Sequence, residues 1–183
     1  MRMALAAWLI VAGGYLSAAA DDSFVEPREL EFAKETYIGR FVAVNEHEKL
    51  AEFTRAGDPL EDWQKLVAVR HYPLANGTPA QAAAAVVRAL QATNPLAKFQ
   101  LLVKEDGSEA LVDFITWPKD GTYAEFNAFR YIKKPNQAGL VSYQFAYRFT
   151  DTSPTGTEQF KRARQLWLEK LRNVEWQVSF EKE

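Results

Sequence analysis

The stretch FQLLVKEDGSEALVDFITW, residues 99–117, decides the fold class. Two apolar runs, both rich in residues that favour strands, flank the turn residues Glu105-Asp106-Gly107-Ser108. An Asp-Gly pair between two such runs is a strong short-range signal of a β-hairpin. The stretch therefore predicts two antiparallel strands, at about 99–104 and 110–117, joined by a tight turn.

Two more runs extend this hairpin into a meander. Turn residues at 118–121 lead to a strand pattern at 123–133, and turn residues at 135–139 lead to another at 140–149. Short loops join strands that lie side by side, so the four runs predict a four-stranded antiparallel meander. Further strand patterns lie upstream, at 37–44 and 63–72, and the segment 46–53 fits either another strand or a helical turn, of which we favour the strand.

Two segments have the periodicity of amphipathic helices. Thr78 and Gln81 stand at capping-box spacing around Pro79, which predicts a helix over 79–93. Apolar residues recur at helical spacing from Phe160 to Val174, which predicts a second helix over 157–173. The chain is therefore expected to be an α+β domain, with an antiparallel sheet of about five to seven strands and two main helices.

The first twenty residues have the pattern of a secretory signal. Arg2 is followed by an apolar run and then by small residues up to Ala20, where a signal peptidase is expected to cut. An uncleaved membrane anchor is the alternative. We expect a signal peptide at 1–20, a loosely ordered lead-in at 21–36 and one α+β domain at 37–183, located in the periplasm or secreted and free of the membrane after cleavage.

Composition excludes several function classes. The formal net charge is −2 and cysteine is absent, while only His47 and His71 could serve as imidazole ligands. We therefore expect no nucleic-acid partner, no metal site and no cofactor. No glycine-rich phosphate loop follows the apolar leader, and no serine has the context of a catalytic nucleophile. No catalytic residue is predicted from these patterns.

The lengths of the turns predict which residues pair across the meander, and pairing decides which residues share a face. We expect Phe99 opposite Phe114, Ile115 opposite Glu125, and Tyr131 opposite Val141. One face then holds acids and an amide among aromatic rings, which is unusual for a core. The candidate ligand-binding residues on it are Asp113, Trp117, Glu125, Asn127, Tyr143 and Tyr147.

Three readings of this aromatic-polar face remain open. It could line a partly open concavity for a ligand, or its acids could pair with arginines in a buried network. The acids could also lie at a wet rim while the C-terminal helix, with Trp167, covers the rings. The opposite face, which includes Phe99, Leu101 and Val103, is expected to lie under the helix at 79–93.

The segment from Glu52 to Leu66 contains Gly57 and Asp58 ahead of Trp63, which opens a strand. This arrangement resembles uncharacterised exported proteins of Gram-negative bacteria. The order of elements over 37–181 is similar to the PsbP/Mog1-type α+β sandwich. The resemblance implies a non-enzymatic accessory or binding role, and it supplies no catalytic residue.

These observations predict an exported, non-catalytic binding or accessory domain that uses the aromatic-polar face or its rim. Its partner would be a small amphipathic ligand or a protein. One alternative is a structural assembly component in which that face is fully buried. Another is a hydrolase with Asp113 and Glu125 as a pair of catalytic carboxylates.

Overall fold

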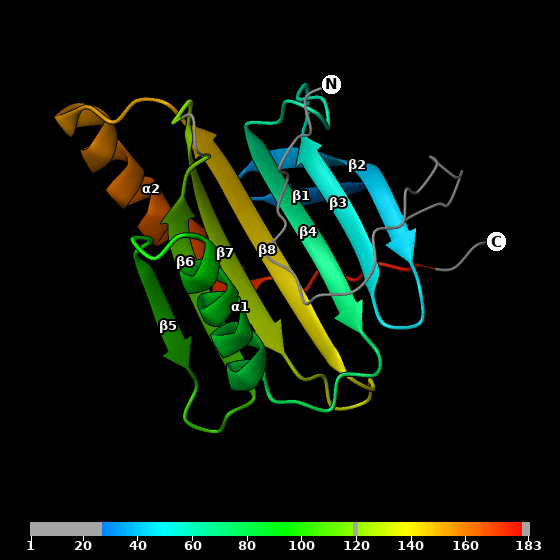
Figure 1. The fold of residues 1–183 in the computed structure, drawn as a ribbon. Helices are drawn as coiled ribbons and strands as arrows, with labels where there is room; N and C mark the ends of the chain where they lie inside the picture. The colour runs from blue at the N-terminus through cyan, green and yellow to red at the C-terminus, as the bar shows by residue number, and fades with distance from the viewer. Residues whose placement is uncertain (1–26, 119–120, 181–183) are drawn as a thin grey trace.

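One antiparallel sheet includes all eight strands of the computed structural model, which describes residues 27–118 and 121–180. The strand order is β1-β2-β3-β4-β8-β7-β6-β5, so β5 forms one edge (Figure 1). The strands are β1 (Glu29–Phe32), β2 (Glu35–Val44), β3 (Lys49–Arg55), β4 (Lys65–Tyr72), β5 (Phe99–Val103), β6 (Glu109–Thr116), β7 (Ala124–Ile132) and β8 (Leu140–Phe149). The helices are α1 (Pro79–Thr93) and α2 (Pro154–Asn173).

The α+β class, the antiparallel sheet and the two helices are confirmed. The sheet has more strands than the expected five to seven, because β1 and the start of β2 form within the segment interpreted as a lead-in. Leu30 and Phe32 of β1 are buried, which explains why this segment is ordered. The predicted signal peptide at 1–20 lies outside the described residues.

Helix α1 covers the part of one sheet face formed by β5, β6 and β7. Its N-terminus has the predicted capping box: Thr78 N–H donates to Gln81 Oε1 at 2.8 Å, and Gln81 N–H donates to Thr78 Oγ1 at 3.2 Å. We call this side of the sheet the α1 face. The buried side chains that pack there are Ala83, Val86, Val87, Leu90, Ala110, Val112, Phe114, Phe129 and Tyr131.

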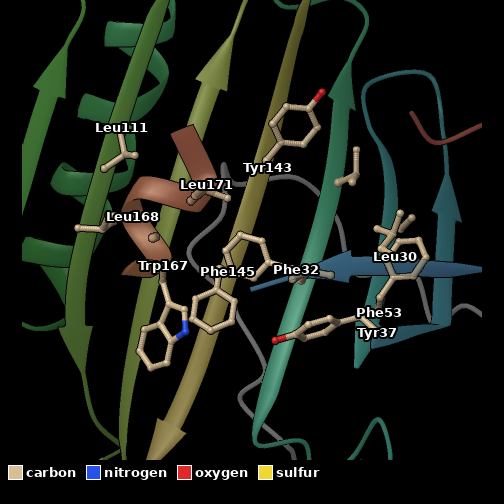
Figure 2. Close-up of a cluster of buried hydrophobic side chains, with 14 of the residues drawn as sticks. Leu30, Phe32, Tyr37, Phe53, Leu111, Tyr143, Phe145, Trp167, Leu168 and Leu171 are labelled. Carbon is tan, nitrogen blue, oxygen red and sulfur yellow. The ribbon is translucent and has the colours of Figure 1, made fainter. Parts of the chain in front are cut away.

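The opposite side, which we call the α2 face, holds the larger core. Trp167 of α2 lies 4.9 Å from the Phe145 ring and 6.0 Å from the Phe126 ring, centre to centre. Strand β1, at the far end of the strand order, crosses the α2 face of the central strands and places the Phe32 ring at 5.0 Å from the Phe145 ring (Figures 1 and 2). The aromatic row of β8 therefore faces a core that α2 and β1 close.

Register agrees with the prediction in one hairpin and differs in two. Phe99 pairs with Phe114 as expected. In contrast, Thr116 rather than Ile115 lies opposite Glu125, and Ser142 rather than Val141 lies opposite Tyr131. Each of these two registers has slipped by one residue, which moves side chains to the other face relative to the neighbouring strand.

Gly139 explains the slip between β7 and β8. Its φ is +80°, so it belongs to the turn and the strand begins at Leu140. A Cβ at Gly139 would collide with the backbone carbonyl of Tyr72, the residue that pairs with Leu140. Only glycine fits this left-handed position against the neighbouring backbone.

We predict that Gly139→Ala destabilises the fold far more than Gly107→Ala. Gly107 also has a positive φ, 69°, but apart from itself and its two chain neighbours no described residue has an atom within 4 Å of where its Cβ would be, so only backbone strain of about 1 kcal/mol is expected there. For Gly139→Ala the backbone clash adds to that strain, and we expect about 3 kcal/mol or more. Urea denaturation of both variants gives the comparison, and equal losses would contradict the role assigned to Gly139.

Trp167→Ala should lower the free energy of unfolding by about 3–5 kcal/mol, because it empties the centre of the α2 face. Leu166→Ala is the matched control, since Leu166 is the preceding helical residue and is 46% exposed. That variant should change stability by about 0.5 kcal/mol or less. Similar losses in the two variants would mean that α2 does not close this core.

Candidate functional site

The two register slips divide the six candidate ligand-binding residues between different places. Asp113, Tyr143 and Tyr147 are on the α2 face, whereas Glu125 and Asn127 are on the α1 face. Trp117 follows the end of β6 and is 45% exposed. The expected single aromatic-polar face is therefore wrong, because a slip of one residue separates the acids of β6 and β7.

The tyrosines of β8 belong to the core. Tyr143 is fully buried, and its hydroxyl donates to the carbonyl oxygen of Trp176 at 3.3 Å. The Trp176 ring meets the Tyr143 ring edge-on at 5.7 Å, and Tyr147 lies 5.0 Å from the ring of Trp167. The interpretation in which the C-terminal helix covers the rings describes these residues correctly.

A row of paired polar side chains crosses β4, β8 and β7 on the α1 face. Arg70 donates to Gln144 Oε1, and Gln144 Nε2 donates to Asn127 Oδ1 at 2.9 Å. Asn127 Nδ2 donates to Glu125 Oε1 at 2.9 Å, and Arg148 Nε donates to Glu125 Oε2 at 3.0 Å. We call these five residues the polar row. Their mutual bonds satisfy groups that would be costly to bury alone.

Both ends of the polar row are held by further contacts. The Arg148 guanidinium stacks 3.7 Å above the Trp63 ring, and Arg70 lies 3.4 Å from Glu48 and 3.6 Å from Glu52. Burial raises the pKa of Glu52 even though Arg70 opposes that shift. The polar row is thus the buried network of acids and arginines that was one of the three readings of the sequence. The arginine that pairs with Glu125 is Arg148.

Asp113 is paired on the other face of the sheet. Arg164 of α2 donates to its Oδ1 from Nε at 2.9 Å and from Nη2 at 2.6 Å. Burial raises the pKa of Asp113 although these bonds lower it, and its Oδ2 has no hydrogen-bond partner within the described part of the chain. Because Asp113 and Glu125 project from opposite faces, they cannot act together on one bond, and the paired-carboxylate hydrolase is contradicted by this geometry.

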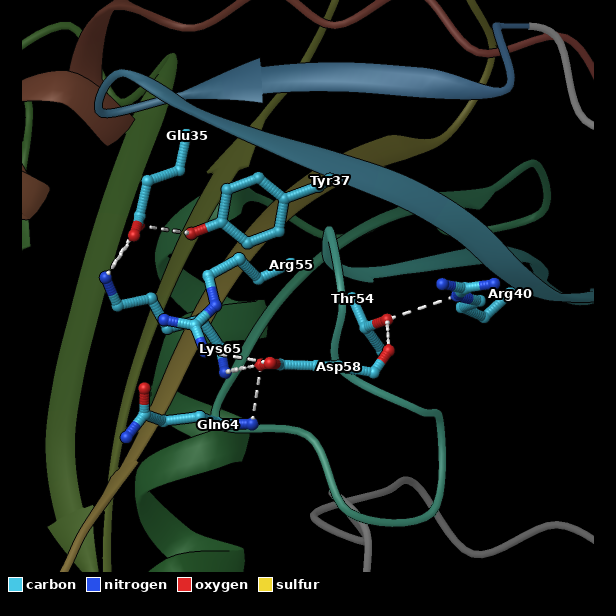
Figure 3. Close-up of polar contacts among 8 residues, drawn as sticks. All are labelled: Glu35, Tyr37, Arg40, Thr54, Arg55, Asp58, Gln64 and Lys65. Carbon is cyan, nitrogen blue, oxygen red and sulfur yellow. Dashed lines mark hydrogen bonds and ion pairs between the residues drawn. The ribbon is translucent and has the colours of Figure 1, made fainter.

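The segment with Gly57 and Asp58 has a structural function (Figure 3). The Asp58 carboxylate accepts hydrogen bonds from Arg55 Nη2 at 2.8 Å and from the backbone N–H groups of Gln64 at 2.9 Å and Lys65 at 3.3 Å. Burial alone would raise the pKa of Asp58, but these bonds outweigh it and hold the pKa below the usual range. Asp58 thereby fixes the start of β4 behind Trp63.

An open groove lies between the C-terminal segment and the ends of β4 and β8. Its volume is about 560 Å³, and both apolar and polar side chains line it. His71 Nε2 lies 2.8 Å from the carbonyl oxygen of Ala138 at this end of the sheet. The main lining residues are Val69, His71, Lys134, Val141, Trp176 and Phe180. A groove of this size is large enough for a small amphipathic molecule.

The edge strand β5 is exposed along its whole length. Phe99 is 38% exposed, Leu101 36%, and both Leu102 and Val103 46%. The expectation that Phe99, Leu101 and Val103 lie buried under α1 is therefore wrong. Helix α1 contacts β5, but it packs its buried side chains mainly against β6 and β7 and leaves the side chains of the edge strand more than a third exposed.

The apolar surface continues beyond the start of β5. Asn94 Nδ2 donates to Thr116 Oγ1 at 3.2 Å, which brings the end of α1 beside the end of β6. Leu96 is 80% exposed in this region, and Trp117 follows Thr116. We define the β5 edge by its exposed apolar residues, which are Leu96, Phe99, Leu101, Leu102, Val103 and Trp117.

Of the six candidate ligand-binding residues, only Trp117 belongs to the β5 edge. One feature of the sequence indicates that β5 is an edge strand. The run at 99–104 begins the meander, so its outer neighbour had to come from a distant segment or be missing. In the structure β4 pairs with β8, which leaves β5 without a strand beyond it among the described residues.

A protein-family model matches residues 24–176. The chain belongs to that family. No curated protein matches the chain significantly. Among solved structures, a point mutant of the protein Mog1 is similar to 83% of this chain and 94% of that chain, with 11% identity and a TM-score of 0.43. At this identity and score the likeness indicates neither a ligand nor an activity.

Two further findings concern residues 27–118 and 121–180. None of their helices combines the length and the hydropathy that a membrane span requires. These residues also contain no group of three or more His, Cys, Asp or Glu side chains placed to hold a metal ion.

The shifted pKa of Asp113 predicts a pH dependence of stability. A carboxyl whose pKa is raised on folding stabilises the fold below its ordinary pKa of 3.8, and this contribution is lost as pH rises through the raised value. The stability of the native chain relative to Asp113→Asn should therefore fall as pH increases from 3.8 upward.

Asp106→Asn provides a control of opposite sign. Hydrogen bonds from the side chain and backbone of Ser108 lower the pKa of the exposed Asp106. The native chain should therefore gain stability relative to Asp106→Asn as pH rises toward 3.8. Urea denaturation across this pH range measures both differences, and an Asp113 difference that rises with pH would contradict the assignment.

Proposed function

We propose that the chain is an exported, non-catalytic accessory domain that binds another protein through the β5 edge. The observation that carries this proposal is the exposure of every residue of β5, most of them large and apolar, at the free edge of the sheet. Natural proteins usually shorten, charge or cover such an edge. An uncovered apolar edge is typical of a surface that pairs with another chain.

The energetics of the rest of the molecule support this choice. The rings of β8 already pack against α2 and β1, and the polar row satisfies its own charges. Binding at either place would require these contacts to break first. At the β5 edge, a partner would remove apolar surface from water at about 25 cal/mol per Å² without disrupting the fold.

The export part of the proposal rests on the leader-like pattern that ends at Ala20. A periplasmic or secreted location would bring the β5 edge into contact with other exported proteins.

A small amphipathic ligand is the second candidate partner, and the 560 Å³ groove beside Trp176 and Lys134 supports it. An assembly component would use the same edge permanently rather than reversibly.

Site-specific crosslinking in the cells that produce the protein tests the proposal. A photoreactive amino acid at Leu102 should form a covalent adduct with a second protein. The same group at Glu46, in the turn at the other side of the sheet and 79% exposed in its side chain, should form none. Adding Leu101→Pro should abolish the adduct at Leu102 while the chain remains folded.

Two results would contradict the proposal. Equal adducts at Leu102 and Glu46 would mean that contact is unspecific. An adduct that persists with Leu101→Pro would mean that strand pairing at the β5 edge is not involved. A circular-dichroism melt of Leu101→Pro shows whether loss of the adduct comes from loss of binding or from unfolding.

A further inference from the structure

The outer backbone groups of β5 can be assigned from the bonds on its inner side. Lys104 N–H donates to Glu109 O at 3.0 Å, and Ile115 N–H donates to Lys98 O at 3.4 Å, so both lysines direct their backbone groups toward β6. Because successive residues of a strand alternate in direction, Phe99, Leu101 and Val103 direct theirs away from β6. Within the described part of the chain, these three N–H groups and three carbonyl groups form an unused ladder edge.

Side chains alternate with the same period and give the edge two different faces. Phe99, Leu101 and Val103 project on the α1 face and make it wholly apolar. On the α2 face Lys98 and Lys104 stand at the two ends of the strand, with Gln100 and Leu102 between them. A strand added here would therefore place its own end residues opposite two ammonium groups.

Other charges near this edge do not remove its positive character. Lys104 lies 3.7 Å from Asp106, but both side chains are about 60% exposed and such pairs are weak. Arg164, which donates to Gln100 Oε1 at 2.8 Å, is paired with Asp113, and Glu109, opposite Lys104, is paired with Arg130, so these four charges balance among themselves. Glu105 lies beyond the strand, in the turn.

These charges argue against a second copy of the chain as the occupant. If two copies paired β5 with β5 in antiparallel fashion and used all the outward backbone groups, the two-fold axis would pass through Leu101. Lys98 of each copy would then lie opposite Lys104 of the other. Like charges directly opposite destabilise a strand pair. Lysines on an edge strand are a known means of preventing such self-association.

Resting on the proposed function, we infer that the β5 edge binds an extended segment of a partner protein that has acidic residues six positions apart and β-branched apolar residues between them. The apolar residues alternate with small polar ones. Their backbone groups exchange hydrogen bonds with Phe99, Leu101 and Val103 in antiparallel register. The two acidic side chains lie opposite Lys98 and Lys104, so charge complementarity selects the partner.

Three synthetic peptides test this inference against the full chain by fluorescence anisotropy. The first is Glu-Val-Thr-Val-Thr-Val-Glu, and the others replace both terminal residues with Gln or with Lys. The acidic peptide should bind about 10-fold more tightly than the basic one, with the Gln peptide between them, because two attractive pairs replace two repulsive ones. The difference should shrink as salt concentration rises.

Charge reversal on the protein provides the matched control. In the double variant Lys98→Glu with Lys104→Glu, the order should invert so that the basic peptide binds most tightly. Both side chains are exposed at the strand ends, so the fold is expected to tolerate the change. An acidic peptide with an N-methyl group on its central Val should bind about 10-fold more weakly or not at all, because one ladder bond is blocked.

The outcomes distinguish this inference from the function on which it rests. Equal binding of all three peptides, abolished by Leu101→Pro, would overturn the acidic partner and leave edge binding intact. Failure of every peptide to bind the native chain would also overturn the inference, and the crosslink at Leu102 would then judge the proposed function alone. A dimer in light scattering that Leu101→Pro dissociates would identify a second copy as the occupant and overturn the inference.

Discussion

The pairing of β7 with β8 is the constraint on which the rest of the structure depends. Gly139 occupies a left-handed turn position against the backbone of Tyr72, so β8 begins one residue later than the loop length suggests. That single step places Glu125 and Asn127 beside Gln144 and Arg148, where each finds a partner. In the other register Glu125 and Asn127 would be buried among rings, and Glu125 would lose its bond to Arg148.

The same step explains why the aromatic residues of β8 are structural. With Glu125 and Asn127 of β7 on the α1 face, the centre of the α2 face is apolar and closes around Trp167, while Arg130 and Asp113 are paired at its margin. A face of this kind is stabilised by burial and offers nothing to a ligand without first opening. Among the described residues, the surfaces left for binding are then the β5 edge and the groove beneath the C-terminal segment. Of these two, the β5 edge has both apolar surface and unpaired ladder groups.

Prediction from sequence succeeded where the signal is local. The Asp106-Gly107 turn gave the correct register of β5 with β6, and the capping box around Pro79 gave the start of α1. It failed where two registers depended on longer loops, since a loop of seven residues does not specify which pair closes it. It also missed β1, because a four-residue strand is too short to show a period and its order comes from burial of Leu30 and Phe32.

The amino-acid sequence by itself determined the α+β class, the antiparallel hairpins and the helix positions, because these follow from turn residues, caps and periods within a few neighbours. It also supplied the lysines at the ends of β5. Only the tertiary structure decided which face each acid occupies, which arginine pairs with it, and that β5 lies at an open edge. The reason is that sheet order and loop register are decided by contacts between residues far apart in the chain, such as β4 with β8, and no local pattern encodes them.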